Sequence, residues 1–422
     1  MPPRDDDWGH CLEYAAISDV GVRRANNQDS HAVVLADSRE TWQRRGHLFM
    51  VADGMGAHAA GELASKIATD TVPLSYHKRQ NVSPPEALLA AVLEANDHIH
   101  ARGQANSDFH GMGTTGTTLL LLPQGVLLAH VGDSRAYRLR GNRFEQLTFD
   151  HSLVWEMQRA GNLSEDEVPG FVGKNIITRS LGPNETVEVD IEGPHPVVVG
   201  DTFLLCSDGL SGQVEDDELG TILMCLPPEE AVQSLVDLAN LRGGPDNITI
   251  VVAKVTGPHI AQGAAADAPG STSPPQPVHP LIWTLLSVAI LGAGVMIVLG
   301  SIEGALAGLL VAAIAGAVAL ILRYQGNPAP AFEGARRGRG PYTGTTCGAN
   351  VEFADALKEL IDQLSTAAER EQWDIDRPKF DRQVAEGAQA AEQGDYVASI
   401  RARLRAIRLV MDDLKRRRRD ER

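Results

Sequence analysis

Between residue 10 and about residue 257, the sequence contains a series of short apolar or alternating runs, several of which follow one another with only a turn between them. Such runs are typical of β-strands, and glycines at 123–125 and 141–142 fit the turns that separate them. The expected strands are 13–18, 31–35, 48–52, 118–122, 126–131, 136–140, 202–206 and 248–254. A parallel, doubly wound sheet needs a helix between consecutive strands, so this order favours antiparallel sheets with helices packed outside them.

Patterns with helical spacing lie between several of these runs. The expected helices are 61–72, 84–101, 153–160, 216–225 and 229–241. Strands and helices together predict one α+β domain over residues 1–257. Hydrophobic residues make up 43% of the chain, which is enough for that domain to bury a sizeable core.

Five acidic residues of this domain stand at predicted strand ends or in turns, most with Gly or Asn beside them: Asp29, Asp53, Asp133, Asp208 and Asp246. A rigid scaffold aims a carboxylate at a strand end, and a neighbouring Gly lets a backbone carbonyl approach an ion. Converging carboxylates repel one another unless a cation joins them, and oxygen ligands with few His or Cys favour Mg²⁺ or Mn²⁺ over Zn²⁺. One Asp-Gly pair is usually only a turn, whereas five such carboxylates in one domain predict a metal site.

The motifs around these residues resemble the type 2C, or PPM, metal-dependent serine/threonine protein phosphatases, and particularly their bacterial branch. The resemblance covers residues 12–255 and rests on eight motifs in the family's order. They are SDVGVRRANNQD at 18–29, VADGMG at 51–56, GMGTT at 111–115, VGDSRAY at 131–137, LTFDHS at 147–152, ITRSLG at 177–182, CSDGL at 206–210 and GPDNIT at 244–249. Each motif is weak alone, but the ordered set is specific.

The resemblance implies an αββα sandwich, in which two antiparallel sheets pack face to face with helices on both outer sides. By their positions in the motifs, Asp53 would bridge two Mn²⁺ or Mg²⁺ ions, and the Gly54 carbonyl would complete the shell of one of them. Asp208 and Asp246 would hold the other ion. Asp29 would lie beside the pair, in contact directly or through water.

Asp133 matches the ligand of a third, weaker ion in bacterial members, and a structural turn cap beside Arg135 is its alternative. Arg24 matches the arginine that grips the substrate phosphate, and a surface ion pair is its alternative. A hydroxide between two such ions is a nucleophile near neutral pH, while Arg24 would neutralise charge on the phosphoryl oxygens. No covalent phosphoenzyme is then needed, and the chain has no Cys-x5-Arg loop.

The sequence departs from the family pattern in two places. Many bacterial members read Asp-Gly-Met-Gly-Gly-His, and Ala57 replaces the last of those glycines here. His58 and a metal-bound water are the two candidates for the acid that protonates the leaving oxygen. Gln28 stands where some relatives carry Glu, which would weaken one water-mediated metal contact.

Charge and cysteine usage restrict the class of partner and the compartment. The formal net charge of −17 argues against a general nucleic-acid binder, which needs Lys and Arg to neutralise phosphates. The four cysteines form no Cys-x-x-Cys pair and suggest no disulfide framework, which fits a reducing compartment. Residues 1–7, MPPRDDD, lack the apolar stretch of a signal peptide.

Two apolar runs, 281–299 and 305–322, follow a Pro/Ala/Gly-rich linker expected at 258–280. Each is long enough to cross a hydrocarbon core of about 30 Å, and the short loop between them predicts a transmembrane hairpin with both ends on one side. Arginines follow the second run, so we expect a two-span protein of the cell inner membrane with both flanking domains in the cytoplasm. A buried helical hairpin and a re-entrant insertion are the alternatives.

A second linker, rich in Gly, Arg and Pro, is expected at 323–350, and the helical patterns 353–368, 377–393 and 396–415 then predict a helical accessory region over 351–422. Gly394-Asp395-Tyr396 predicts a tight turn that faintly resembles a tetratricopeptide unit. One such unit cannot form a solenoid, so a module that binds a protein partner and a small bundle or dimerisation element both stay open. The basic run 415–419 would either complement the helix dipole or contact anionic lipid headgroups.

The resemblance therefore implies a membrane-tethered enzyme that hydrolyses phosphoserine and phosphothreonine on proteins and opposes a serine/threonine kinase. The expected partners are phosphoprotein substrates, that kinase, the lipid bilayer and a protein partner of the C-terminal helices. A catalytically inactive scaffold on the same fold is the alternative. Such scaffolds usually lose metal carboxylates, whereas this chain keeps Asp53, Asp208 and Asp246.

Overall fold

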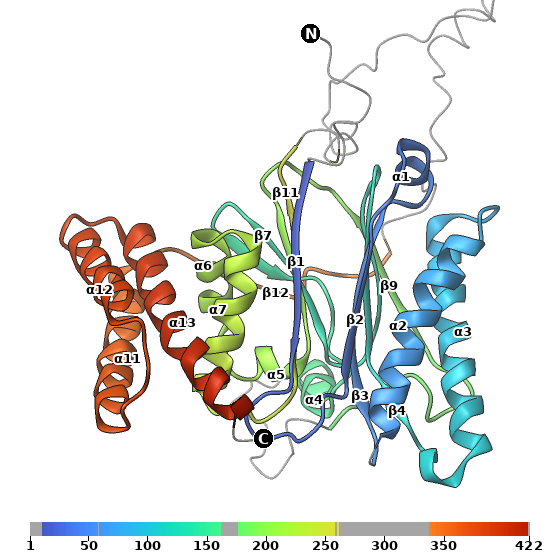
Figure 1. Cartoon of the computed structure of the whole chain (residues 1–422). Helices are drawn as coiled ribbons and strands as arrows, with labels where there is room; N and C mark the ends of the chain where they lie inside the picture. The colour runs from blue at the N-terminus through green and yellow to red at the C-terminus, as the bar shows by residue number, and fades with distance from the viewer. Residues whose placement is uncertain (1–10, 58, 162–175, 258–259, 261–336, 421–422) are drawn as a thin grey trace, which may run out of the picture. The chain divides into compact units, whose positions relative to one another are not determined.

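Two antiparallel sheets form the centre of the computed structural model, which describes residues 11–57, 59–161, 176–257, 260 and 337–420 (Figure 1). The first, called the β1 sheet, has the strand order β1 (Leu12–Asp19), β11 (Ile248–Val255), β10 (Thr202–Cys206), β7 (Arg135–Arg140), β8 (Arg143–Gln146) and β12 (Thr343–Thr346). The second, called the β2 sheet, has the order β2 (Asp29–Val34), β3 (His47–Met55), β5 (Gly116–Leu122), β6 (Gly125–Val131) and β9 (Asp190–His195), and β4 (Gly113–Thr114) pairs with β3. The expectation of antiparallel sheets is confirmed.

Alternating side chains divide the interior into two apolar layers, as the two-residue period of a strand requires. In β10, Phe203 and Leu205 lie in the core between the sheets, whereas Leu204 and Cys206 lie in the core between the β1 sheet and its helices. All four side chains are fully buried. Burying a side chain such as Leu or Phe contributes about 1.5–3 kcal/mol, so β10 stabilises both layers at once.

Helices cover the outer faces of both sheets (Figure 1). The β2 sheet is covered by α2 (Ala60–Lys78) and α3 (Pro84–Ala105), and the β1 sheet by α6 (Asp216–Cys225) and α7 (Pro228–Leu241). Pro84 and Pro85 open α3, and the Glu86 carboxylate accepts the Ser83 N–H at 3.3 Å, which fixes the start of that helix. The sandwich expected from the family resemblance is therefore present in the described residues.

Several short elements were not expected from the sequence. They are α1 (Arg39–Arg45), the 3₁₀ turn at Ser107–Phe109, α5 (Asp208–Ser211), β8 and β9. Helix α4 (Leu153–Gly161), by contrast, agrees with the helix expected at 153–160. Strand β9 contains Gly193-Pro194, which interrupts a strand pattern, and β8 has the polar sequence Arg-Phe-Glu-Gln. Pairing with β6 and β7, and not their own composition, makes these segments strands.

Residues 337–350, called the strap, correct the expectation of a linker throughout 323–350. Arg337 exchanges two backbone hydrogen bonds of 3.0 Å with Gly193 of β9, and β12 pairs with β8, so the strap contacts one edge strand of each sheet. The Glu192 carboxylate accepts the Gly340 N–H at 3.2 Å and the Tyr342 hydroxyl. The sequence analysis missed β12 because its Thr-Gly-Thr-Thr side chains are largely exposed and carry no apolar pattern.

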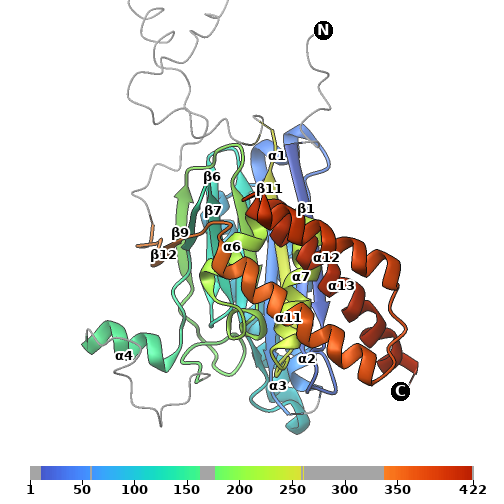
Figure 2. The ribbon, with the colours of Figure 1, turned by 90° about the vertical axis from the view of Figure 1, so that its left-hand side faces the viewer.

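The expected C-terminal helices are present as α11 (Val351–Arg370), α12 (Arg377–Glu392) and α13 (Tyr396–Asp420), and they pack on the outer side of α6 and α7 (Figure 2). Their apolar faces share one core with those helices; Leu357 and Ile361 of α11, Ile407 of α13 and Leu235 of α7 are all buried in it. Gly394, with φ of 76°, makes the expected tight turn before α13. We call α11, α12 and α13 together the C-terminal layer.

Three cations of α13 tie it to the helices beneath. Arg405 donates to both oxygens of Glu230 at 2.7 and 2.8 Å, and Lys415 Nζ lies 2.7 Å from Asp237 Oδ1. Arg401 donates to the Cys225 carbonyl at 3.0 Å. Lys415 was expected only as part of a helix-end or lipid-binding run, and it is instead a partner of α7.

Among the described residues, no helix has both the length and the apolar character needed to cross a bilayer. The two apolar runs 281–299 and 305–322 lie outside the described residues, as does nearly all of the linker expected at 258–280.

Candidate functional site

Four of the five aspartates meet at one end of the sandwich because the strands that carry them end there. Asp29 begins β2 and lies directly opposite Asp53 of β3 in the ladder. Asp208 follows β10 at the start of α5, and Asp246 lies in the turn that precedes β11. Strands β10 and β11 are antiparallel neighbours, with Cys206 opposite Ile250, so the end of one and the start of the other are adjacent. Both sheets therefore contribute carboxylates to the same rim.

Burial and mutual repulsion disfavour negative charge on these groups. The pKa of Asp53 is held well above its usual range, first by desolvation of its carboxylate and then by the charges of Asp29 and Asp208. Burial raises the pKa of Asp29 to about 6, and the charge of Asp208 adds to that effect. Burial also raises the pKa of Asp208, and the charge of Asp246 adds to that effect. A nearby cation is the interaction that would reverse these shifts.

Three carboxylate oxygens of the cluster are buried without a hydrogen-bond partner: Asp29 Oδ1, Asp133 Oδ1 and Asp208 Oδ1. Burying a carboxylate oxygen without a hydrogen-bond partner costs free energy. Acceptors that lack such a partner and lie among other negative charges therefore indicate a site that suits a cation. A donor set made only of oxygen suits hard divalent ions such as Mg²⁺ or Mn²⁺. The residues present therefore fit such an ion chemically.

Within the described part of the chain, no three His, Cys, Asp or Glu side chains are already arranged as a ligand set around one point. Two of the carboxylates have other partners. Arg24 Nη2 lies 2.6 Å from Asp246 Oδ2, and Ser207 Oγ donates to Asp29 Oδ2 at 2.7 Å. The fit to a cation thus rests on the donor chemistry and the orphaned oxygens.

Gly54 lies beside Asp53 in β3, where a side chain has no room. A Cβ atom there would come within 2.1 Å of the Gly61 carbonyl oxygen and 2.4 Å of the Gln28 carbonyl oxygen. The Gly54 N–H donates to Gln28 at 3.1 Å, which joins β3 to the segment before β2. Neighbouring backbone therefore leaves room only for Gly at this position, and the contact of its carbonyl with an ion stays a prediction.

Asp133 follows Gly132 at the end of β6, and burial raises its pKa to about 7, with the charge of Asp208 as the next cause. The alternative role of Asp133, a structural turn cap beside Arg135, stays a prediction and does not require an ion pair between the two side chains. The Arg135 guanidinium donates to Asp150 at 2.8 Å instead. Asp133 is thus electrostatically part of the cluster.

Arg24 lies in the turn after β1, and its side chain is 51% exposed while it contacts Asp246. Its guanidinium is accessible from solvent and directly adjoins the carboxylates, as a phosphate-binding group must. His58 lies outside the described residues, so the structure does not place the candidate general acid.

Two residues that hold the cluster in place, Asn247 and Ser207, could not be identified from the sequence. Asn247 accepts the Gln28 N–H at 2.8 Å and donates to the carbonyls of Val20 and Asn26 at 2.9 and 3.0 Å. Ser207 orients Asp29 from a position far away in the sequence. Their only signal was adjacency to Asp246 and Asp208, which gave no indication of their partners.

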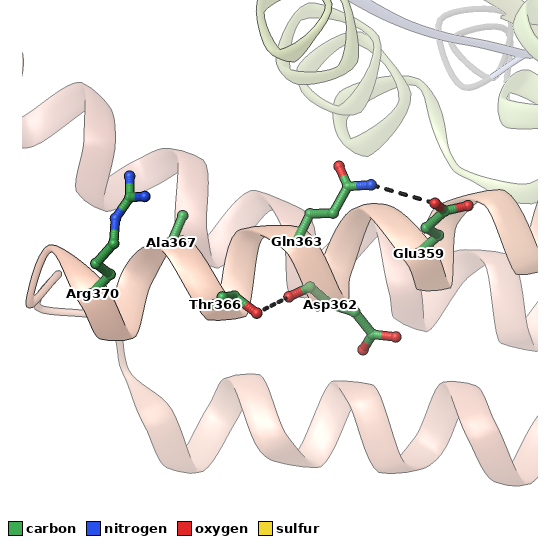
Figure 3. Close-up of a pocket in the computed structure, with 6 residues that line it drawn as sticks. All are labelled: Glu359, Asp362, Gln363, Thr366, Ala367 and Arg370. Carbon is green, nitrogen blue, oxygen red and sulfur yellow. Dashed lines mark hydrogen bonds between the residues drawn. The ribbon is translucent and has the colours of Figure 1, made fainter.

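A hollow of about 460 Å³ lies along the exposed face of α11 (Figure 3). It is lined by Glu359, Asp362, Gln363, Thr366, Ala367 and Arg370. All of these residues belong to one helix of the C-terminal layer, and none comes from the aspartate-bearing segments. We therefore assign the chemistry to the aspartate cluster and not to this hollow.

Comparison with known proteins gives consistent matches over the first part of the chain. The family model described as Protein phosphatase 2C matches residues 22–239. Protein phosphatase PhpP of Streptococcus pneumoniae is 36% identical over 247 residues, which cover 57% of this chain and 96% of that protein. Serine/threonine protein phosphatase PstP of Mycobacterium tuberculosis is 38% identical over 244 residues, which cover 58% of this chain and 45% of that protein. A crystal structure of a PstP catalytic domain in complex with two manganese ions is 36% identical, covers 58% of this chain and 99% of its own, and has a TM-score of 0.50.

Proposed function

Because this chain belongs to the protein phosphatase 2C family of serine/threonine protein phosphatases, we propose that its aspartate cluster binds two Mn²⁺ or Mg²⁺ ions and uses them to hydrolyse phosphoserine and phosphothreonine on proteins. One observation carries this proposal: carboxylates from both sheets meet at one rim, with raised pKa values and orphaned oxygens. The two manganese ions named for a PstP structure support the choice of ion.

The proposed ligands follow the motif positions. Asp53 would contact both ions, with the Gly54 carbonyl on one of them and Asp208 and Asp246 on the other. Asp29, held by Ser207, would lie beside the pair, and Asp133 would serve a third, weaker ion. When bound, such ions lower the pKa of water and polarise the phosphoryl group.

The protein's own contribution would be to place the phosphate. The Arg24 guanidinium is half-exposed and sits at the rim, where two parallel N–H groups suit the oxygens of a phosphate dianion. In this role, Arg24 would exchange its contact with Asp246 for one with the substrate. His58 is the proposed proton donor to the leaving serine or threonine oxygen.

The test is phosphate release from a phosphothreonine peptide by the purified full-length chain in detergent. Release should require Mn²⁺, stop on addition of EDTA and return when Mn²⁺ is restored in excess. The same preparation should bind Mn²⁺ in calorimetry. No Mn²⁺-dependent release would reject the proposal, and no Mn²⁺ binding as well would favour an inactive scaffold.

We further propose that the runs 281–299 and 305–322 anchor the enzyme in the cell inner membrane as a hairpin. The residues on both sides of the hairpin would lie in the cytoplasm, where the enzyme would oppose a serine/threonine kinase. The strap and the C-terminal layer share a core and sheet edges with the catalytic strands. The chain that leaves after residue 257 must therefore return to the same side by residue 337. An even number of crossings satisfies this requirement, and two runs supply it.

Labelling of a single cysteine tests this topology, because the four native cysteines are all buried. In intact cells, Ser301→Cys in the predicted loop should react with a membrane-impermeant maleimide, whereas Ser365→Cys on α11 should react only after the cells are opened. Labelling of both, or of neither, in intact cells would contradict the hairpin.

A further inference from the structure

The turn that carries Arg24 and the loop that carries Asp246 interlock through their backbones. The Gly244 carbonyl accepts the N–H groups of Val22 and Arg23 at 2.9 and 3.2 Å. Gly21 has φ of 77°, and a Cβ atom on it would lie 2.2 Å from the Asp246 carbonyl oxygen. The position of one segment therefore determines the position of the other.

Asn240, in the last turn of α7, contacts both segments and is only 8% exposed. Its side-chain Nδ2 donates to Asp19 Oδ1 at 3.1 Å, and the same oxygen accepts the Gly21 N–H at 2.9 Å. On the other side, its backbone carbonyl accepts the Gly243 N–H at 3.0 Å. A Cβ atom on Gly244 would lie 2.5 Å from Asn240 Oδ1, so that loop passes directly over the side chain.

Ion pairs with α13 hold α7, the helix that carries Asn240, on its outer face. Asp237 lies one turn earlier in α7 and pairs with Lys415 of α13, while Glu230 near the start of α7 pairs with Arg405. The opposite face of α7 packs on β1 and β11. Asn240 thus projects from a helix fixed on both faces, which is what a residue needs to position two loops.

We propose that Asn240 is a positioning residue of the phosphatase, which holds the Arg24 turn and the Asp246 loop in register. The Asn240 side chain forms no hydrogen bond with the five clustered aspartates or with the Arg24 guanidinium; its amide donates to Asp19, and its Oδ1 has no partner among the described residues. It acts through Asp19 on one side and through Gly243 and Gly244 on the other. The inference rests on the proposed roles of Arg24 with phosphate and of Asp246 with a metal ion.

Asn240→Asp in the full-length chain is the central test, since it keeps the size of the side chain but replaces the donor that faces Asp19 by a carboxylate. Mn²⁺ affinity in calorimetry should fall by about 10–100-fold, as is typical when a group supporting metal ligands is lost. KM for a phosphothreonine peptide should rise, while kcat at saturating Mn²⁺ and peptide changes less. Asp19→Ala removes the same hydrogen bond from the other partner and should have the same effects.

Two controls separate positioning from general stability. Glu230→Gln weakens the α7–α13 contact at the far end of the helix and should leave Mn²⁺ affinity unchanged. Asn240→Ala combined with Asp19→Ala should lose clearly less affinity than the sum of the two single losses, because both variants remove the hydrogen bond between these side chains. Wild-type Mn²⁺ affinity and KM in a folded Asn240→Asp protein would overturn the proposal, and so would fully additive losses. A wild-type chain without Mn²⁺-dependent turnover would instead reject the proposed function itself.

Discussion

Asp53→Asn should reduce kcat/KM for a phosphothreonine peptide on the order of 10³-fold or more, and it should not destabilise the protein in EDTA. The activity falls because an amide cannot join two cations as a carboxylate does. Metal ions stabilise the transition state by several kcal/mol, and each 1.36 kcal/mol of that stabilisation corresponds to about a tenfold change in rate. Stability is kept because the Asp53 carboxylate lies among like charges, and Asn removes its own charge at nearly constant volume. Initial rates in Mn²⁺ and urea unfolding in EDTA measure the two effects.

Asp70→Asn is the matched control for this variant. Asp70 lies on the exposed face of α2 and pairs with Lys66 at 2.7 Å, so the same chemical change there should leave kcat/KM unaltered. Such exposed pairs contribute only about 0.2–1 kcal/mol. Full turnover by Asp53→Asn would exclude the assignment of Asp53 as the bridging ligand.

Lys415→Met should lower the free energy of unfolding by about 3–5 kcal/mol near pH 8, because it leaves a buried carboxylate without its cation. The Asp237 side chain is 1% exposed, and its Oδ2 already lacks a hydrogen-bond partner. Even beside Lys415, burial raises the pKa of Asp237 to about 6. Urea unfolding of the detergent-solubilised chain at two pH values measures the effect.

The pH dependence of this loss has a definite sign. A carboxyl group whose pKa is raised on folding contributes stability at low pH that disappears as the pH rises through the folded value, here about 6. Removing Lys415 raises that pKa further. The deficit should therefore be large near pH 8 and much smaller near pH 5, where Asp237 is mostly protonated in both proteins.

Two comparisons identify the charge as the cause. Asp237→Asn combined with Lys415→Met should recover most of the lost stability, since no unpaired charge remains. Lys358→Met on the exposed face of α11 should change stability by less than about 0.5 kcal/mol. A deficit of equal size at both pH values would mean that Lys415 contributes packing and not charge.

The sequence predicted those strands whose own side chains are buried. Strands β5, β6, β10 and β11 are apolar along nearly their whole length, and their ends agree with the expected ones within a few residues. Strand β12 could not be found in this way, because Thr343–Thr346 is held by backbone pairing with β8 and buries almost nothing. Edge strands of this kind are determined by the partner, which lies elsewhere in the chain.

In the site, too, the residue types could be predicted from local motifs, whereas their contact partners could not. The five aspartates could be identified because each stands in a recognisable local motif. That Arg24 contacts Asp246, and that Ser207 holds Asp29, depends on the register of β1, β11 and β10, which no local pattern contains. Asn240 gave no signal at all, since an Asn in the last turn of a helix is common on chemical grounds alone.

The C-terminal helices were predictable as helices but not as part of the catalytic unit. Leu357, Ile361 and Leu364 recur at helical spacing, which shows that α11 has an apolar face. The spacing does not reveal which surface covers that face. Only the structure shows that it is the outer side of α6 and α7, in one shared core.

The strap and the C-terminal layer also impose an order on biosynthesis. A ribosome makes residues 337–420 after the sheets and after α6 and α7, so a nascent chain that ends before them leaves the outer faces of α6 and α7 and the edge of β8 in contact with water. In the proposed topology, the hairpin emerges before those residues do. The newly made enzyme would then complete its catalytic unit only after the hairpin had emerged, and chains that stop before residue 337 would leave those surfaces open to proteolysis.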